Sequence, residues 1–359
     1  MKELNSWVLY ANNEDAWQAM ITDCANAKSS IVLEQFIFAN DEFGQRLIDV
    51  CKERAKDDVH VRFLWDAAGS FTFWGAELID ELRKSGIELI FWKTLIPGFF
   101  SIPNAKSWFF RNHRRTLVID NTIGYSGSIC VHDSYKNWRD TNVRLEGPVV
   151  REMKNAFEQM WARAIHRRRI RYQKAPKTNE FRYLTNYPAP GRRHIYSEIL
   201  KAIRRARENI YITVPYFVPT HRLLRTIKAA GRRGVDVRII LPEKSDHYLV
   251  DLGARAYFTS LIKSGVKIYL YTGNIIHSKS ITIDDTWSTV GSMNLDSVSL
   301  LYNFEANVVT TNDRFSKELK SHFYQDLQET KEVTLRNLQK RFIGEKIISF
   351  FIHLIKRFL

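Results

Sequence analysis

The two halves of this 359-residue chain repeat one another, and this duplication constrains the fold more than any other feature of the sequence. Three pairs of similar segments follow in the same order: 25–38 with 204–217, 57–66 with 233–243, and Lys-Ser-Gly at 84–86 with Lys-Ser-Gly at 263–265. In both members of a pair, a segment with a helical pattern leads into an apolar segment with a strand pattern. The sequence of each half therefore predicts a regular alternation of helices and strands.

That alternation predicts an α/β fold with two similar α/β/α sandwich lobes, each built on a mostly parallel sheet, and an active site between the lobes. We expect the first lobe at 1–165, a basic linker at 166–181, the second lobe at 182–330, and a basic and apolar membrane-associating tail at 331–359. The linker suits a solvated surface better than a binding strip. The tail would lie in a membrane interface or dock on the protein.

One motif occurs once in each half. The first copy comprises His113, Arg115 and Asp120, followed by Gly127 and Ser128. The second copy comprises His277, Lys279 and Asp284, followed by Gly291, Ser292 and Asn294. In both copies the Gly-Ser pair begins 14 residues after the histidine. A single match of this kind carries little weight, whereas two copies at matched positions indicate one duplicated functional device.

Strand geometry explains the spacing of the histidine and the cation. Side chains two residues apart on a strand point to the same face, so each imidazole and its neighbouring cation would meet one ligand. A phosphodiester fits this arrangement, because one neutral imidazole can attack phosphorus while the other, as imidazolium, protonates the leaving alcohol. No metal and no cofactor are required, since side chains supply the positive charge.

The place of each residue within or after the two motifs suggests its role. The catalytic candidates are the members of both motifs: His113, Arg115, Asp120, His277, Lys279 and Asp284. The two motif aspartates suit a structural link better than proton transfer. The candidate phosphate-binding groups are Ser128, Ser292 and Asn294. Asp140 and Glu305 follow the two histidines by 27 and 28 residues, and each could orient a histidine by accepting its Nδ1 proton in a hydrogen bond.

Composition indicates the kind of partner. The 54 Lys and Arg residues exceed the 39 Asp and Glu residues by 15, which favours an anionic partner, either nucleic acid or a membrane face. Three widely spaced cysteines argue against a disulfide framework, and the N-terminal residues match neither a signal peptide nor a spanning helix. The first half carries 15 extra residues within 93–111, whose aromatic side chains would contact acyl chains or pack into the lobe.

The paired motifs, with Gly-Ser in the first copy and Gly-Ser-x-Asn in the second, resemble the signature of the phospholipase D superfamily, from about Ser6 to about Glu329. Segments 25–38, 143–150 and 290–308 are most similar to bacterial cardiolipin synthases, among them the cardiolipin synthase B type without N-terminal membrane helices. The resemblance implies a pseudo-dimer that transfers a phosphatidyl group to phosphatidylglycerol, forming cardiolipin through a phosphohistidine. It also implies that His113 is the nucleophile and His277 the acid.

Other activities stay open within the superfamily. A phospholipase D-type hydrolase or a nuclease would use the same histidines with water as acceptor, while a silent scaffold is disfavoured because both histidines are present. The implied partners are anionic phospholipids (phosphatidylglycerol and cardiolipin) and the cytoplasmic face of a bacterial cell membrane, bound peripherally. Nucleic acid is disfavoured and no obligate protein partner is evident. Two residues depart from the family pattern: Arg115 stands where many members have Lys, and Cys130 stands where Asn is usual.

Overall fold

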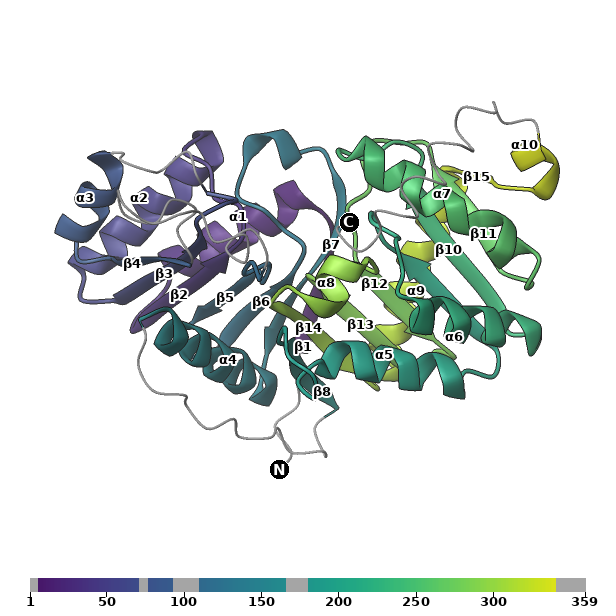
Figure 1. Ribbon diagram of the computed structural model, residues 1–359. Helices are drawn as coiled ribbons and strands as arrows, with labels where there is room; N and C mark the ends of the chain where they lie inside the picture. Colours follow the sequence, from purple (N-terminus) through teal and green to yellow (C-terminus); the bar gives the residue numbers. More distant parts are fainter. Residues whose placement is uncertain (1–5, 71–76, 93–109, 166–179, 340–359) are drawn as a thin grey trace.

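The computed structural model describes residues 6–70, 77–92, 110–165 and 180–339. The chain forms two lobes that lie side by side, the first drawn in purple to teal and the second in green to yellow (Figure 1). Each lobe contains one sheet with helices packed on both of its faces. The α/β class and the two-lobed organisation expected from the duplication are therefore confirmed.

The first lobe has a seven-stranded sheet in the order β1-β7-β6-β5-β2-β3-β4. Its strands are β1 (Ser6–Asn12), β2 (Ser30–Gln35), β3 (His60–Asp66), β4 (Glu88–Trp92), β5 (Thr116–Ile119), β6 (Ile123–Gly127) and β7 (Arg139–Glu146). Its helices are α1 (Asn13–Ala25), α2 (Glu42–Lys56), α3 (Glu77–Lys84), the short 3-10 helix η3 (Asp133–Tyr135) and α4 (Pro148–Ala164). Helices α1, α2 and α3 cover one face of the sheet, and α4 covers the other.

The second lobe has an eight-stranded sheet in the order β15-β11-β10-β9-β12-β13-β14-β8. Its strands are β8 (Phe181–Asn186), β9 (Asn209–Thr213), β10 (Asp236–Pro242), β11 (Lys267–Tyr271), β12 (Ser280–Ile283), β13 (Trp287–Gly291), β14 (Glu305–Thr310) and β15 (Thr330–Glu332). Its helices are α5 (His194–Arg205), α6 (His221–Arg232), α7 (Tyr248–Ile262), α8 (Ser297–Leu301), α9 (Asp313–Gln328) and α10 (Leu335–Gln339). Apart from β15, the strand order repeats that of the first lobe, so the two lobes share one topology.

Both sheets are mixed, so the prediction of mostly parallel sheets is wrong. Among the strands of the described residues, the parallel pairs are those within β2-β3-β4 and within β9-β10-β11, where helices connect the strands. The motif strands β5 and β12 instead enter hairpins, whose turns hold Asp120 and Asn121 at φ of 51° and 57°, and Asp284 and Asp285 at 51° and 54°. The turns comprise the three residues 120–122 and 284–286. Turns this short join only antiparallel strands, and Asp and Asn tolerate this backbone conformation.

Local sequence signals fix where several helices begin. Asn12, Asp41 and Thr220 accept hydrogen bonds from backbone N–H groups in the first turns of α1, α2 and α6. Helix α4 begins at Pro148 after Gly147, whose φ of 103° favours glycine. These helix starts turn the chain from the sheet edge onto the sheet faces.

An apolar cluster shared by the two lobes joins them. It includes Phe157 of α4 in the first lobe together with Phe181 of β8 and Phe315 of α9 in the second. The ring of Trp7 in β1 lies 5.5 Å from that of Phe181 and 5.8 Å from that of Phe315. Because buried aromatic contacts of this kind resist separation, the two halves of a site at this junction are held at a fixed spacing.

Three segments singled out in the sequence lie wholly or largely outside the described residues: the basic linker, the aromatic insertion and the apolar tail. The domain boundaries therefore stay predictions. Within the parts of the chain that the structure describes, we find no helix with both the length and the apolar character needed to cross a bilayer.

Candidate active site

The two motif histidines lie buried at the junction of the lobes, with 8% of His113 and 6% of His277 exposed. Each stands just before its motif strand, β5 or β12, and each is tied to the opposite lobe through its backbone. The His113 N–H donates to the Phe304 carbonyl at 3.0 Å, and the His277 N–H donates to the Arg139 carbonyl at 2.8 Å. The two halves of the chain thus meet at the histidines themselves.

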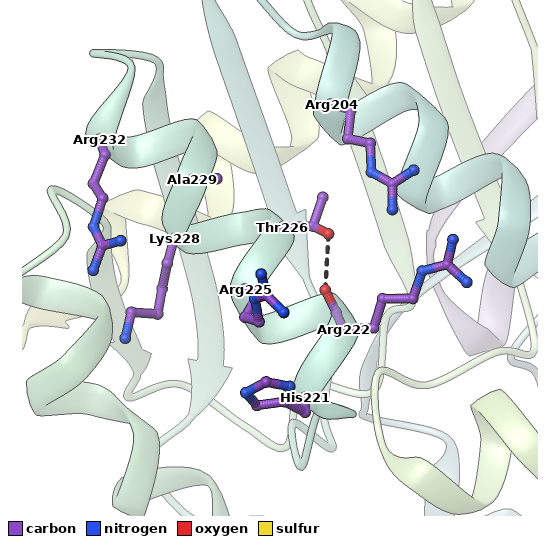
Figure 2. A pocket seen from close by; sticks show the side chains of 8 residues that line it. All are labelled: Arg204, His221, Arg222, Arg225, Thr226, Lys228, Ala229 and Arg232. Carbon is purple, nitrogen blue, oxygen red and sulfur yellow. Dashed lines mark hydrogen bonds between the residues drawn. The ribbon is translucent and has the colours of Figure 1, made fainter.

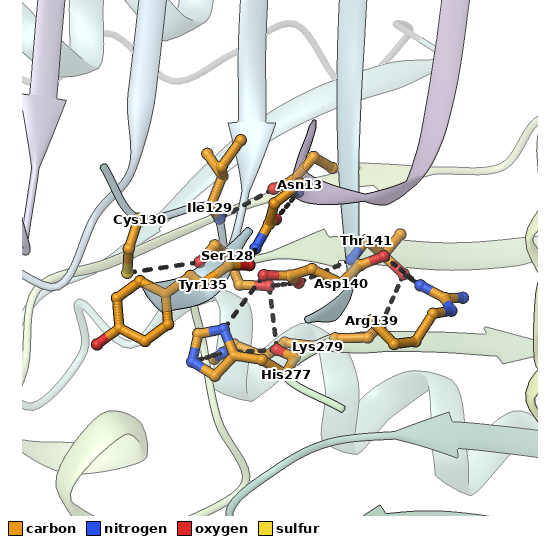
Figure 3. Close-up of polar contacts among 12 residues, drawn as sticks. Asn13, Ser128, Ile129, Cys130, Tyr135, Arg139, Asp140, Thr141, His277 and Lys279 are labelled. Atoms are coloured by element: carbon orange, nitrogen blue, oxygen red, sulfur yellow. Dashed lines mark hydrogen bonds and ion pairs between the residues drawn. The ribbon is translucent and has the colours of Figure 1, made fainter. Parts of the chain in front are cut away.

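Each histidine is paired with a carboxylate from the other lobe. The Nδ1 of His113 lies 2.9 and 3.0 Å from the two carboxylate oxygens of Glu305, which begins β14. The Nδ1 of His277 lies 3.2 Å from Oδ2 of Asp140 in β7 (Figure 3). The sequence placed one acid after each histidine, and the fold exchanges them between the lobes. Neither lobe therefore contains a complete histidine–acid pair.

A cation lies at the other ring nitrogen of each histidine. The Nη2 of Arg115 is 3.1 Å from Nε2 of His113, and the Nζ of Lys279 is 2.9 Å from Nε2 of His277. Because a guanidinium and an ammonium can only donate, each Nε2 accepts and each Nδ1 carries the proton that its carboxylate accepts. This tautomer leaves the Nε2 lone pair of both imidazoles directed toward the cations, where a phosphate would bind.

The motif serines contact the acids. The hydroxyl of Ser128 donates to Asp140, and that of Ser292 donates to Glu305. Each serine also contacts the backbone at the junction, Ser128 through the His277 carbonyl at 3.2 Å and Ser292 through the Ala306 N–H at 3.0 Å. Their contacts suit orientation of the carboxylates rather than the phosphate binding expected for them from sequence.

The side chain of Asn294 is the third phosphate-binding candidate, and it is 2% exposed. Its side-chain oxygen has no hydrogen-bond partner among the described residues. At the matching position of the first half stands Cys130, whose Sγ lies 3.3 Å from Nε of Arg115. This oxygen can only accept a hydrogen bond, so it is available to a donor group of a ligand, whereas the thiol is already engaged.

The structure does not bring the motif aspartates to the histidines. The Asp120 carboxylate accepts hydrogen bonds from the backbone N–H groups of residues 28–30, at 2.7 to 2.9 Å. The Asp284 carboxylate accepts from those of residues 207–209, at 2.8 to 2.9 Å. Both acids thereby fasten a hairpin turn to the start of the neighbouring strand, so the contacts support the structural link and give no support to a catalytic role.

Burial and the nearby cations keep both imidazoles neutral in the free site. Burial, followed by the charges of Arg115 and Lys279, lowers the pKa of His113 well below its usual value. Burial and the charge of Lys279 lower the pKa of His277 to about 4, against the opposing effect of Asp140. Burial and the charge of Arg115 also lower the pKa of Lys279 to about 7. Two cations and two neutral bases thus converge on a small buried volume.

The two acids differ in their electrostatics. Although burial alone would raise its pKa, the hydrogen bond and charge of His277 and the charge of Lys279 hold the pKa of Asp140 at about 2. Burial raises the pKa of Glu305 well above its usual value, despite the hydrogen bond from Ser292. Asp140 therefore stabilises a positive charge on its histidine more strongly than Glu305 does.

Sequence reasoning missed the aromatic side chains around His277. The ring centroids of Tyr135, Trp138 and Tyr216 lie 6.4, 5.4 and 6.4 Å from that of the imidazole. Tyr135 ends η3, whereas Trp138 and Tyr216 lie in loops of the first and second lobe, and no spacing in the sequence relates the three to a motif. The ring of Phe36 lies near His113 in a similar way, with 4.9 Å between the ring centroids. Phe36 lies in segment 25–38, and the similarity of this segment to 204–217 was the only sequence signal that could have drawn attention to it.

A family model described as "Cardiolipin synthase, PLD-like domain" matches residues 20–161 and 199–327, and each matched region holds one motif. The chain belongs to this phospholipase D-like cardiolipin synthase family. The family resemblance drawn from the paired motifs is thereby confirmed, as is the enzyme class, a phosphatidyltransferase. Among the described residues, no group of three or more His, Cys, Asp or Glu side chains could hold a metal ion.

Relatives in this family match nearly the whole chain. The cardiolipin synthase of Clostridium perfringens strain SM101 is 32% identical over 362 residues, which cover 95% of this chain and 75% of the relative. The major cardiolipin synthase ClsA of Bacillus subtilis strain 168 is 32% identical over 355 residues, which cover 94% of this chain and 72% of the relative.

Solved structures share the fold at low sequence identity. A phosphatidylserine synthase from Haemophilus influenzae superposes with a TM-score of 0.74 at 15% identity, covering 98% of this chain and 93% of that one. A polyphosphate kinase from Porphyromonas gingivalis superposes with a TM-score of 0.62 at 10% identity, covering 99% of this chain and 53% of that one. These likenesses support the two-lobed fold of this chain.

Proposed function

We propose that this cardiolipin synthase family member transfers a phosphatidyl group to the glycerol headgroup of phosphatidylglycerol, forming cardiolipin through a phosphohistidine. The exchange of acids between the lobes carries the proposal. Because each imidazole has its Nδ1 on a carboxylate and its Nε2 beside a cation, both can act on one phosphodiester bound between them.

In the first step His113 Nε2 attacks phosphorus, a P–N bond forms, and the P–O bond to the leaving alcohol breaks. The positive charge that develops on the imidazole favours the ionised form of Glu305, whose carboxylate accepts the Nδ1 proton in a hydrogen bond of 2.9 Å and stabilises that charge. Arg115 and Lys279 offset the negative charge on the phosphoryl oxygens in the transition state.

His277 suits the role of the acid better than His113 does. Its partner Asp140 has a pKa of about 2 and is fully ionised, so it stabilises an imidazolium. Bound phosphate brings negative charge next to Lys279 and Arg115, which offsets the repulsion that lowers the pKa of His277 in the free site. His277 then protonates the leaving alcohol. In the second step His277 takes the proton of the incoming hydroxyl, whose oxygen forms a P–O bond as the P–N bond to His113 breaks.

We place this reaction at the cytoplasmic face of a bacterial membrane, to which the protein binds peripherally and where anionic phospholipids supply both substrates. The net charge of +15 supports attraction to such a surface. The same histidines would hydrolyse a phosphodiester if water replaced the acceptor, so the assay must separate transfer from hydrolysis.

The deciding experiment incubates the protein with phosphatidylglycerol vesicles and analyses the lipids by mass spectrometry. We expect cardiolipin from the wild type and none from His113→Ala or His277→Ala. Phosphatidic acid as the main product would indicate a hydrolase instead. Absence of both lipids with a folded wild-type protein would refute the proposal.

A second experiment identifies the nucleophile. With a phosphatidyl donor that carries 4-nitrophenol, the leaving group departs without protonation, so His277→Ala should still form the phosphoenzyme while His113→Ala should not. After rapid denaturation at neutral to alkaline pH, radiolabelled phosphate should map to the peptide that contains His113. A label on His277 would reverse the assignment.

A further inference from the structure

The duplicated helices of the two lobes differ sharply in charge. Helices α1 and α2 of the first lobe contain four Lys or Arg residues and six Asp or Glu residues, a net charge of −2. Their counterparts α5 and α6 contain seven and one, a net charge of +6. The fold needs the same apolar faces in both lobes, so it does not account for the excess of cations on one pair.

Five of these seven Lys and Arg residues line a cavity of about 620 Å³. Figure 2 shows Arg204 of α5 on the same side of α6 as Arg222, while Lys228 and Arg232 project from the other side of that helix. The lining includes Arg204, His221, Arg222, Arg225, Lys228 and Arg232. It contains no acidic side chain and none of the residues of the candidate active site. This α5–α6 cavity is therefore a second concentration of positive charge.

These cations lack acidic partners. None of the five Lys and Arg side chains of the α5–α6 cavity lies within 4 Å of a carboxylate in the described ranges of the chain. Along α6, like charges follow one another at spacings of three and four residues, which destabilises a helix. On the matched helix α2, by contrast, Arg54 pairs with Asp57 at 2.8 Å and Lys52 pairs with Glu81. A set of cations that lines one cavity without acidic partners suits an external anion.

An apolar cavity adjoins the cationic one. His221 lines both, and the second cavity also includes Pro219, Leu224, Ala256 and Leu301. Its volume is also about 620 Å³. A cationic and an apolar cavity side by side match a phospholipid in a bilayer, whose phosphate and acyl chains belong to one molecule, better than a nucleic-acid backbone, which has no long apolar chain.

We infer that the α5–α6 cavity is a docking site for the headgroups of anionic phospholipids in a bilayer. Guanidinium groups bind phosphate oxygens through paired hydrogen bonds, and each cation near an anionic surface adds to the attraction. The choice of phospholipid rests on the proposed function, whereas the binding itself does not require turnover. Docking here brings the second lobe against the membrane that supplies the substrates.

The test compares two variants that lose the same number of charges. The docking variant carries Arg222→Gln, Arg225→Gln, Lys228→Gln and Arg232→Gln on α6. The matched control carries Arg46→Gln, Lys52→Gln, Arg54→Gln and Lys56→Gln on α2. Both retain the full chain, and glutamine preserves helix propensity, so thermal melts should verify folding in each. Their net charges are equal, so long-range attraction to a vesicle changes equally.

Binding is measured by co-sedimentation with vesicles of phosphatidylcholine containing graded amounts of phosphatidylglycerol. We expect the docking variant to lose about tenfold or more in affinity for the anionic vesicles, and the control to lose less than about threefold. Equal losses in the two variants would overturn the proposal, because only total charge would then matter. Unchanged vesicle binding with lost binding to a single-stranded oligonucleotide would also overturn it.

Activity separates this site from the catalytic one. On vesicles at low lipid concentration, cardiolipin formation by the docking variant should fall in proportion to its binding. On phosphatidylglycerol dispersed in detergent, its turnover should equal that of the wild type. Loss of turnover in detergent would overturn the proposal by placing these cations in catalysis. If the wild type forms no cardiolipin in either assay, the proposed function fails while the binding comparison still decides the docking site.

Discussion

His113 in the first half of the chain and Glu305 in the second half, 192 residues later, form one hydrogen-bonded pair with 2.9 Å between Nδ1 and Oε1. The reciprocal pair joins His277 to Asp140 at 3.2 Å. Each lobe thus orients the imidazole of the other. A change that separates the lobes therefore disables both histidines together, which explains why an extensive apolar cluster spans the same junction.

Glu305→Gln tests the exchanged acid directly. Glutamine keeps the size and an acceptor oxygen but removes the negative charge that stabilises the developing imidazolium, so we expect kcat to fall by about 10² to 10⁴. Formation of the phosphoenzyme should slow by the same factor in rapid-quench experiments. Glu198→Gln on α5, outside the site, is the control and should stay within about twofold of wild type. A Glu305→Gln enzyme within threefold of wild type would contradict the role of this acid.

Lys279→Arg tests the electrostatics of the site through its pH dependence. In the free protein the pKa of Lys279 is lowered to about 7, so the ammonium loses its proton as the pH rises through that value, and the phosphate contact weakens. We expect the alkaline limb of kcat/KM to begin near pH 7 in the wild type. A guanidinium stays charged, so in Lys279→Arg this limb should move to higher pH.

The opposite substitution in the first half, a lysine in place of an arginine, is the matched control for the pH dependence of kcat/KM. Arg115→Lys puts a titrating amine at the equivalent position of the first half, where an arginine is already accommodated, and should move the alkaline limb to lower pH. If the alkaline limbs of wild type, Lys279→Arg and Arg115→Lys coincide, the charge at these positions does not control the profile.

The sequence predicted the elements of the site better than their arrangement. The offsets of 27 and 28 residues singled out Asp140 and Glu305, because both follow the motif in the same way in each half. Which histidine each acid hydrogen-bonds depends on how the two lobes pack, and no local sequence pattern encodes this packing. The sequence places Asp120 and Asp284 among the motif residues but favours a structural link for both, and Asp-Asn and Asp-Asp between apolar runs also signal tight turns.

Other features were hidden because burial is not visible in a single sequence. Arg114 occupies a variable position of the first motif, yet it is fully buried and donates to Glu34 of β2 at 2.6 Å. In the second motif the equivalent residue is Ser278, which contacts Thr141 at 2.7 Å instead. The residue after His113 thus forms a buried ion pair, whereas the residue after His277 forms a hydrogen bond between two hydroxyls. The two halves therefore differ at these positions as well as at Arg115 and Cys130.

Asp120→Asn separates the structural role of the motif aspartate from catalysis. Asparagine tolerates the left-handed backbone at φ 51° but lacks the charge that three backbone N–H groups contact. We expect a loss of about 1–2 kcal/mol in the free energy of unfolding, limited by the partial exposure of the carboxylate. At temperatures where both proteins are folded, kcat should change less than about threefold.

The pH dependence of this stability difference has a definite sign. Although burial opposes it, the backbone hydrogen bonds from Ser30, Lys28 and Ser29 lower the pKa of Asp120. The carboxylate therefore contributes stability that is fully present above its unfolded-state pKa and is lost as the pH falls through its lowered folded-state pKa. Denaturant titrations of wild type and Asp120→Asn should converge in acid. A difference that persists below that range, or a large loss of kcat, would contradict a purely structural role.

Cys130 and Asn294 occupy equivalent positions in the two halves. Exchanging their residue types tests whether this difference between the halves affects the reaction. Burial raises the pKa of the Cys130 thiol, so it is neutral and a poor hydrogen-bonding group. Asn is similar in size and is already accommodated at the matching position 294. Cys130→Asn should therefore add one neutral donor for a phosphate oxygen in the first half and raise kcat/KM by about threefold to tenfold. Cys130→Ala should stay within about threefold of wild type, because no thiolate takes part.

Asn294→Cys is the reverse exchange and should lower kcat/KM by a similar factor. The informative readout is the ratio of phosphoenzyme formation to acceptor transfer, measured in single turnovers with phosphatidylglycerol as the acceptor. If Cys130→Asn alters phosphoenzyme formation while leaving transfer unchanged, position 130 acts on the donor lipid. A Cys130→Asn protein that folds normally but loses activity tenfold would show instead that the thiol contact to Arg115, 3.3 Å from Sγ, is needed to hold the guanidinium beside His113.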